Sequence, residues 1–297
     1  MSEGKSETTV GERRQLLGLA YRLLGSTVDA EDAVQEAYVR WYRLTPQARE
    51  QVDAPGAWLM TATGRICLDV LGSARARRER YVGEWLPEPL PGTELVGGST
   101  APGDPAERVS MDESVSMALM VVLDTLTPAE RVSFVLHDVF QYTFAEIADI
   151  VGRTPQACRQ LASSARARIA KARTDPRSDE RRGDILRAFK SAWETGDVHG
   201  LVDLLDPSIV VIADGGGKAQ ASLRPIHGPA RIANFLEKSR DLAPDLTFEE
   251  TTVNGEEGLL ARDGDGGVVV VMAFGIVGDR IQHIWAMRNP EKLARWS

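Results

Sequence analysis

Apolar residues recur at helical spacing in the first part of the chain. Leu16, Leu19 and Leu23 lie three or four residues apart, which places them on one face of a helix. Ser26, with Asp29 three residues later, predicts the start of a second helix. The residues of that helix expected to point inward or partly inward are Ala30, Ala33, Val34, Ala37, Val39 and Trp41. A third helix is expected from about residue 57 to beyond residue 75, so residues 12–80 predict an all-helical domain.

Residues 82–106 differ in character, because the stretch 84–92 contains three prolines, which remove hydrogen-bond donors and fix φ. The same stretch contains a tryptophan and two leucines, which a purely flexible linker seldom carries. Helical signals return after residue 107. Thr127 and Glu130 form a capping-box pattern, and the proline between them suits the first turn of a helix. Thr143 and Thr154 repeat the capping signal, so a second helical domain is expected.

The last third of the chain mixes helices with strands. Its β-branched stretches are separated by two hairpin-turn signals, Asn254-Gly255 and Gly278-Asp279. The expected helices are 184–195, 197–205 and 228–241, and the expected strands are 209–213, 246–253, 257–262, 267–277 and 280–287. Helices followed by a mostly antiparallel sheet form an α+β pattern.

A helix-turn-helix is the most specific pattern in the sequence. Ile147, Ala148 and Val151 form the inner face of a short helix, and Gly152 supplies the turn. The inner face of the next helix is Ala157, Cys158, Leu161 and Ala165. Its other face has residue types that read base edges or hold phosphate. The predicted DNA contacts are Arg153, Thr154, Gln156, Arg159, Gln160, Ser163, Arg166 and Arg168. The alternative interpretation is a helical hairpin with a solvated, charged face.

The net charge of −8 argues against a general nucleic-acid binder, which is usually basic. Basic residues instead gather in two islands, residues 65–80 with a net charge of +3 and residues 153–177 with +6. Two separate DNA contacts are therefore expected, with weak binding by the free protein because its acidic surface repels phosphate. The sequence has no apolar run of 18 residues, no signal-peptide pattern, and only two cysteines, Cys67 and Cys158. A membrane span, a metal site and a cofactor are therefore not predicted, and a cytoplasmic location is expected.

Three blocks resemble, in the same order, the extracytoplasmic-function (ECF) sigma factors of bacterial RNA polymerase. The stretch DAEDAVQEA at 29–37 resembles their polymerase-binding helix. AWL at 57–59 and RICLD at 65–69 resemble their −10 recognition segment, and LTPAER at 126–131 with the helix-turn-helix resembles their −35-binding domain. The resemblance implies sigma region 2 at 1–81, a linker at 82–106 and sigma region 4 at 107–175. It implies core RNA polymerase and promoter DNA as partners and no enzymatic activity.

An acidic helix face in a DNA-binding protein is complementary in charge to a basic protein surface. The resemblance implies that this surface is the clamp of RNA polymerase. The residues of this face are Asp29, Glu31, Asp32, Gln35 and Glu36, for which a solvated face is the alternative. The −10 contacts are expected to be Trp58, Arg65, Arg75, Arg77, Arg78 and Arg80, although Trp58 also suits core packing. Fully extended, residues 80–107 span roughly 90 Å, enough to join two boxes about 17 base pairs, or roughly 60 Å, apart.

The element order of residues 184–297 resembles a SnoaL-like domain, in which a curved sheet and helices form a cone around a pocket. WLPEP at 85–89, DGGGK at 214–218 and NPEKL at 289–293 resemble motifs of sigma factors with such a domain, where Asp is more common than Glu291. The resemblance implies that the domain is a built-in modulator. We expect it to dock on the sigma regions, because the linker carries apolar residues and the three glycines at 215–217 permit close approach to another surface. Its expected contacts are Trp85, Leu86, Pro87, Asp214, Gly215, Gly216, Gly217, Lys218, Asn289, Pro290 and Lys292.

Other functions stay open for this sequence. Cone folds also host enzymes, and Asp214, His227, His283 and Trp285 could line a pocket that holds a general base or a small-molecule effector. Asp214 is also an ordinary residue at the start of a Gly-rich turn. A further alternative is a helix-turn-helix regulator that works without polymerase. Such a regulator has no need of an acidic helix followed by an Arg-rich one.

Overall fold

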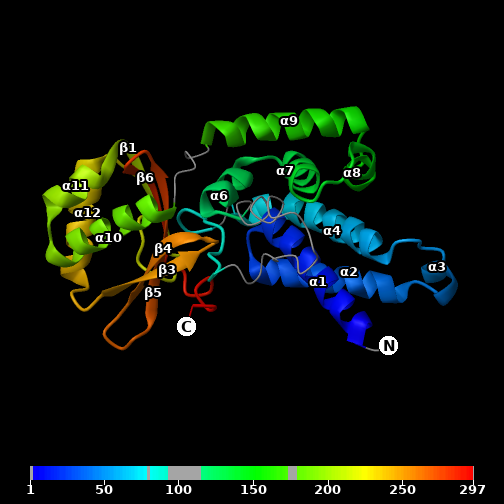
Figure 1. Ribbon diagram of the computed structural model, residues 1–297, viewed down its shortest axis with the longest axis horizontal. Helices are drawn as coiled ribbons and strands as arrows, with labels where there is room; N and C mark the ends of the chain where they lie inside the picture. The colour runs from blue at the N-terminus through cyan, green and yellow to red at the C-terminus, as the bar shows by residue number, and fades with distance from the viewer. Residues whose placement is uncertain (1–2, 79–80, 93–114, 173–178, 297) are drawn as a thin grey trace. The chain divides into compact units, whose positions relative to one another are not determined.

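The computed structural model describes residues 3–78, 81–92, 115–172 and 179–296. These residues form two compact units (Figure 1). The first is helical and contains α1–α4 and α6–α9, and the second combines residues 81–92 with residues 179–296. The predicted fold class, two helical regions followed by an α+β domain, is confirmed.

The first helical region follows the predicted pattern closely. Its helices are α1 (Glu3–Leu24), α2 (Thr27–Arg43), α3 (Pro46–Glu50) and α4 (Pro55–Arg78). Leu19 and Leu23 are fully buried, and the side chain of Ser26 accepts a hydrogen bond from the Asp29 N–H at 3.2 Å. The prediction that Val39 faces inward is wrong, since its side chain is 41% exposed. Val39 lies two residues, or about 200°, beyond the buried Ala37, which turns it to the outer face of α2.

The second helical region contains the helix-turn-helix. Its elements are α6 (Met117–Thr125), α7 (Pro128–Phe134), the π-helical turn η1 (Val135–Val139), α8 (Phe144–Val151) and α9 (Pro155–Ala172). Thr127 and Thr143 form the predicted capping boxes with the glutamates three residues on. Gly152 makes the turn in the left-handed region at φ 67°, and its N–H bonds the Ala148 carbonyl. The sequence pattern did not predict η1.

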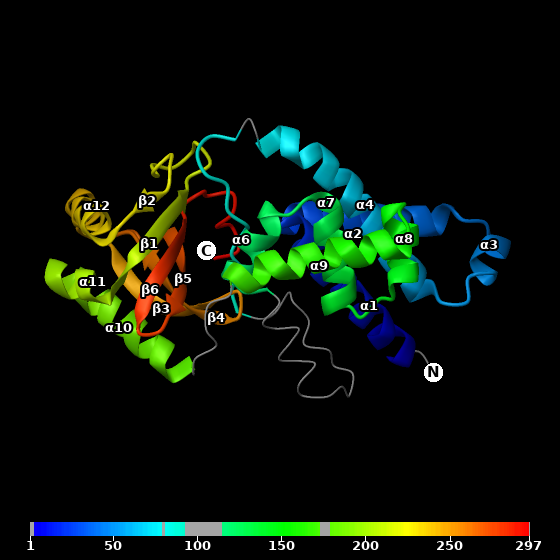
Figure 2. The same ribbon diagram turned by 90° about the horizontal axis from the view of Figure 1, so that it is seen from above.

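The two helical regions pack on each other inside the first unit (Figure 2), with α4 against α7 and α8. Gly64 of α4 makes room for Ile150, because a Cβ at position 64 would lie 3.3 Å from the Ile150 Cγ2 atom. Arg131 of α7 is buried and donates to the Leu23 carbonyl at 2.8 Å and to the Asp124 carboxylate at 2.9 Å. The contacts of Gly64 with Ile150 and of Arg131 with Leu23 join residues that the sequence places in separate domains.

The second unit is built around one mixed sheet with helices gathered on one side (Figure 1). Its elements are α10 (Asp179–Thr195), α11 (Val198–Leu204), β1 (Leu205–Asp214), β2 (Ile226–His227), α12 (Pro229–Leu242), β3 (Thr247–Val253), β4 (Glu256–Arg262), β5 (Val268–Val277) and β6 (Arg280–Met287). The strand order is β2-β1-β6-β5-β4-β3, with β1 and β6 parallel and the other neighbours antiparallel. The main core includes Phe189, Trp193, Phe248 and Phe274, which pack between the helices and the sheet.

Residues 81–92 are part of the second unit rather than a free linker. Leu86 and Leu90 are buried, with 2% and 1% of their surface exposed. The Leu90 N–H donates to the Asn254 side chain at 2.9 Å, and the Trp296 indole N–H donates to the Pro89 carbonyl at 3.0 Å. The prolines of this stretch suit such a docked, extended segment, because they need no N–H partner.

Candidate functional sites

The recognition helix α9 exposes a continuous polar face. Cys158, Ala162, Ala165 and Ile169 are buried on its inner side. Arg153, Gln156, Arg159, Gln160 and Ser163 are exposed on or just before the helix. Thr154 is also exposed, but its hydroxyl accepts the Ala157 N–H at 3.2 Å and so caps α9. The first two turns of α9 therefore expose Gln156, Arg159 and Gln160 on the side opposite the buried face.

The two arginines expected to hold phosphate are paired with carboxylates. The Arg166 guanidinium lies 2.6 Å from the Asp138 carboxylate of η1, and that of Arg168 lies 3.6 Å from Glu130 of α7. Burial alone would raise the pKa of Glu130, but hydrogen bonds from Thr127 and Ser164 outweigh it and the pKa is lowered. Both arginines therefore attach α9 to the preceding helices in this structure.

The α4 residues expected at the −10 box lie in different surroundings. Trp58 is half-buried, with its ring centroid 5.2 Å from that of Trp41, so it does pack in the protein. The exposed Arg65 donates to the main-chain carbonyl of Asp149 in α8 at 2.9 Å. The side chains of Arg75, Arg77 and Arg78, and all of Arg80, lie outside the described residues.

The outer face of α2 combines acidic and apolar side chains. Asp32 and Gln35 are exposed, Asp29, Glu31 and Glu36 are half-exposed, and Glu36 pairs with Arg40 at 2.8 Å. Val28, Val39 and Tyr42 lie along the same side and are 65%, 41% and 67% exposed. A row of exposed apolar residues beside carboxylates is typical of a protein-binding surface.

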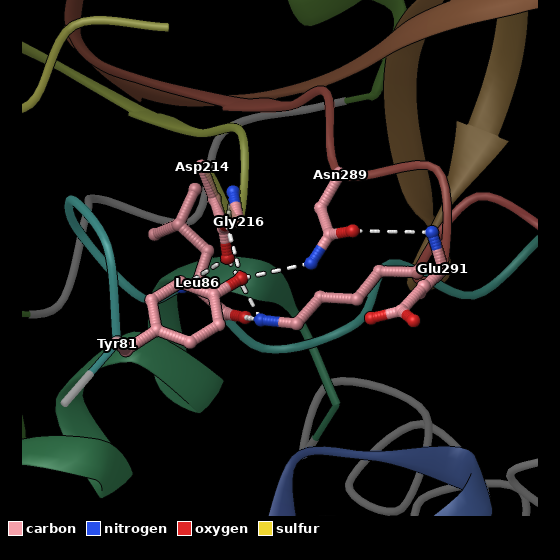
Figure 3. Close-up of polar contacts among 7 residues, drawn as sticks. Tyr81, Leu86, Asp214, Gly216, Asn289 and Glu291 are labelled. Carbon is pink, nitrogen blue, oxygen red and sulfur yellow. Dashed lines mark hydrogen bonds and ion pairs between the residues drawn. The ribbon is translucent and has the colours of Figure 1, made fainter. Parts of the chain in front are cut away.

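The most highly connected polar site lies in the second unit, around the buried carboxylate of Asp214 (Figure 3). One oxygen accepts the Tyr81 hydroxyl at 2.6 Å and the Gly216 N–H at 3.0 Å. The other accepts the Leu86 N–H at 2.9 Å and the Lys292 ammonium at 2.7 Å. Asp214 thus joins the three motifs noted in the sequence, WLPEP, DGGGK and NPEKL.

Lys292 completes this site from the C-terminal tail. Its ammonium also donates to the Leu86 carbonyl at 2.6 Å and lies 4.3 Å from the Trp85 ring centroid. The Tyr81 hydroxyl accepts from Asn289 at 2.8 Å. Burial, followed by the hydrogen bond to Asp214, raises the pKa of Tyr81. Sequence reasoning missed Tyr81, because nothing in its local pattern marks it as a partner of Asp214.

The remaining predicted contact residues shape or flank the site. Gly215 and Gly216 are required for close approach, since a Cβ on Gly216 would lie 2.4 Å from the Asn289 amide nitrogen. Gly217 is left-handed at φ 70°. Lys218 and Glu291 form an exposed ion pair. Pro87 is buried with the segment, and Pro290 is exposed.

The four residues considered as pocket-lining do not face the helix-covered core. His227 and His283 both pair with Val210 across neighbouring strands, which puts all three on one face of the sheet. Trp285 shares that face, and the core uses the alternate residues Ile209, Val211 and Ile284. Burial lowers the pKa of His283, and Asp214 is held by four donors. The strand register therefore turns these residues toward the face of the sheet that the helices do not cover.

Comparisons with known proteins identify the class that these features define. Three family descriptions match the chain, Sigma-70 region 2 at residues 11–78, Sigma-70 region 4 at 116–169 and a SnoaL-like domain at 186–287. The chain belongs to the ECF RNA polymerase sigma factors that carry a C-terminal SnoaL-like domain.

Two mycobacterial proteins illustrate this likeness. The ECF RNA polymerase sigma factor SigJ of Mycobacterium tuberculosis is 37% identical over 294 residues, which cover 94% of this chain and 90% of SigJ. The SigJ crystal structure matches with a TM-score of 0.73 at 33% identity, covering 98% of both chains. A probable ECF sigma factor of that species, SigI, is 38% identical over 66% of this chain and 65% of its own. Among the described residues, no helix has the length and apolarity needed to span a membrane.

Proposed function

We propose that this chain binds core RNA polymerase and directs it to promoters with two recognition boxes, under the control of its own C-terminal domain. The observation that carries the proposal is α9, which packs its apolar face inward and presents Arg and Gln residues in its first two turns. In a helix-turn-helix, these turns enter the major groove. A protein that works with polymerase and promoter DNA acts in the bacterial cytoplasm.

The polymerase contact is assigned to the outer face of α2. Its carboxylates suit a basic partner surface, and Val28, Val39 and Tyr42 supply apolar area around them. Complementary charge at such a surface favours the correct partner and speeds its association. The same acidic face would repel DNA, so it separates this proposal from a regulator that works without polymerase.

Charge reversal on α2 tests this assignment. The double variant Asp32→Lys/Glu36→Lys is expected to weaken binding to core polymerase at least about tenfold, because it places like charges against the basic partner. A matched control is Glu50→Lys, which reverses an exposed charge on α3. Binding measured by fluorescence anisotropy should distinguish the two. Equal affinity of the double variant and the wild type would rule out α2 as the contact.

Recognition of the downstream box is assigned to α4, with Trp58, Arg65 and the arginines at the end of that helix. Arg65 would re-orient toward a nucleotide at the expense of its hydrogen bond to the Asp149 carbonyl. Binding of DNA by α4 is therefore expected to compete with the packing of α8 on α4. The upstream box is assigned to Arg153, Gln156, Arg159 and Gln160, with Arg166 and Arg168 mainly holding α9 in place.

Control by the C-terminal domain is assigned to the Asp214 site. Asp214 and Lys292 hold residues 81–92, the part of the chain that follows α4. A segment held in this way is not available as free tether between the two DNA-binding regions. Release of the segment would lengthen the tether and change the affinity for a promoter with fixed box spacing.

Paired variants test this control. Asp214→Asn and Lys292→Met each remove the buried ion pair and are expected to change promoter-dependent transcription in the same direction, by about 5- to 150-fold for a typical coupling. Lys218→Ala removes only an exposed pair and serves as the control. Transcription from one promoter with core polymerase is the readout. If all three variants match the wild type, the Asp214 site has no regulatory role.

A further inference from the structure

An aromatic ring orders one of the predicted base-reading arginines. Arg159 lies in the second turn of α9 and is exposed, and its guanidinium carbon is 5.2 Å from the centroid of the Phe144 ring. A guanidinium within about 6 Å of a ring face is attracted to it. In contrast, Arg166 and Arg168 on the same helix pair with carboxylates. Arg159 is thus oriented by a ring, and no carboxylate among the described residues forms an ion pair with it.

Phe144 also contacts a residue of η1. Its ring stacks on the imidazole of His137 with 4.0 Å between centroids and 28° between planes. The Nδ1 atom of His137 lies 2.8 Å from the carbonyl oxygen of Tyr142. The left-handed Gln141, at φ 58°, turns the chain back after η1 and brings these residues together. His137 and Arg159 therefore both contact the Phe144 ring, which links η1, α8 and α9.

None of the side chains of His137, Phe144 and Arg159 is fully buried. The buried residues of α8 are Ile147, Ala148 and Ile150, whereas Phe144 is half-exposed at the first position of the helix. A guanidinium stacked on a ring keeps the N–H donors of its plane free. Two of those donors match the O6 and N7 acceptors of guanine in the major groove, the most common specific contact of arginine with a base.

We propose that Phe144, whose ring also contacts His137, is a positioning residue that orients Arg159 to read one guanine of the upstream promoter box. This inference rests on the proposed function and adds a specificity role for a residue outside the recognition helix. Phe144 itself touches no base in this proposal. It acts by reducing the number of rotamers that Arg159 must give up on binding.

Selection from a promoter library with a randomised upstream box tests the proposal. Full-length protein with core polymerase is used for the wild type, Arg159→Ala, Phe144→Leu, Phe144→Met and Phe144→Tyr. Arg159→Ala should lose preference for guanine at one position by about 5- to 150-fold. Phe144→Leu and Phe144→Met should reduce preference at that same position by about two- to fivefold. Phe144→Tyr keeps a ring and should retain the preference.

The readout separates positioning from a structural role. Damage to the fold would weaken every position of the box alike. Phe144→Met keeps a long apolar side chain and Phe144→Tyr keeps the ring, so agreement of the two ring-less variants and their difference from Phe144→Tyr separate the two causes. The double variant Arg159→Ala/Phe144→Met should show no loss beyond that of Arg159→Ala. A full guanine preference in both ring-less variants, or an equal loss at every position, would overturn the inference. A wild type that selects no upstream box would overturn the proposed function as well.

Discussion

The carboxylate of Asp214 is fully buried and has four donors from four different residues. The sequence motif predicts the turn that follows it, because an aspartate before glycines is ordinary turn chemistry. Its other partners, Tyr81, Leu86 and Lys292, come from distant parts of the chain. No local pattern encodes such pairings. Leu86 and Lys292 were predicted because they lie in motifs that resemble those of the family, whereas Tyr81 lies in none of the three motifs and was missed.

Removal of the Asp214 charge is predicted to destabilise the second unit. Asp214→Asn should lower its free energy of unfolding by about 3–5 kcal/mol, because Lys292 would remain nearly buried without its anion. Lys218→Ala should have little effect, since both partners of that pair are exposed. Urea denaturation of the full chain checks both values. An Asp214→Asn protein as stable as the wild type would show that the ion pair contributes nothing net.

Asp138 offers a test of how Arg166 is used. Asp138→Asn should free Arg166 for phosphate, so the affinity for an upstream-box fragment should rise. The slope of the logarithm of the binding constant against the logarithm of the salt concentration should become steeper by about one unit. Asp241→Asn, an exposed change on α12, is the matched control. If affinity and salt dependence stay at wild-type values, Arg166 does not face the DNA backbone.

The helices illustrate what sequence patterns can and cannot predict at the scale of elements. Caps at Ser26, Thr127 and Thr143 and the turn at Gly152 were predictable, because each depends on residues within one turn of helix. The burial of Ile150 was not predicted, since it depends on α4 packing against α8. The π-helical turn η1 was missed because its hydrogen bonds leave no clear mark on apolar spacing.

The capping box at Glu130 gives the second helical region a predictable pH dependence. The pKa of Glu130 is lowered in the folded protein, so its contribution is complete above the unfolded value of about 4.3 and is lost as the pH falls below it. Glu130→Gln should therefore flatten the loss of stability between about pH 5 and pH 3, whereas Glu50→Gln, at an exposed position, should not. Circular dichroism unfolding curves across that range are the measurement. Parallel pH profiles for Glu130→Gln and the wild type would contradict this.

For the whole molecule, the main revision concerns residues 81–92. Their composition predicted that they belong to a linker, and the tryptophan and two leucines in it suggested docking on another surface. They pack on the C-terminal unit, where Leu86 and Leu90 are buried and the Trp296 indole N–H donates to the Pro89 carbonyl. Pattern analysis predicts that apolar residues are buried but not which surface receives them.

Truncation of one buried leucine should reveal this role. Leu86→Ala is expected to lower the free energy of unfolding of the second unit by about 2–5 kcal/mol, because it leaves a cavity. Leu223→Ala, at a leucine that is 64% exposed, is the control. Hydrogen exchange of β1 and β6 would report the change, and equal exchange in both variants would show that the segment is dispensable.

The most direct measurement for the whole account is initiation by purified core polymerase on a mixture of promoter templates. The polymerase is supplied with no sigma factor, with the full chain, or with Asp32→Lys/Glu36→Lys. We expect specific transcripts only with the full chain. The double variant should fold normally but should not support these transcripts. Equal transcription with and without the full chain would contradict the assignment of this protein as a promoter-recognition subunit.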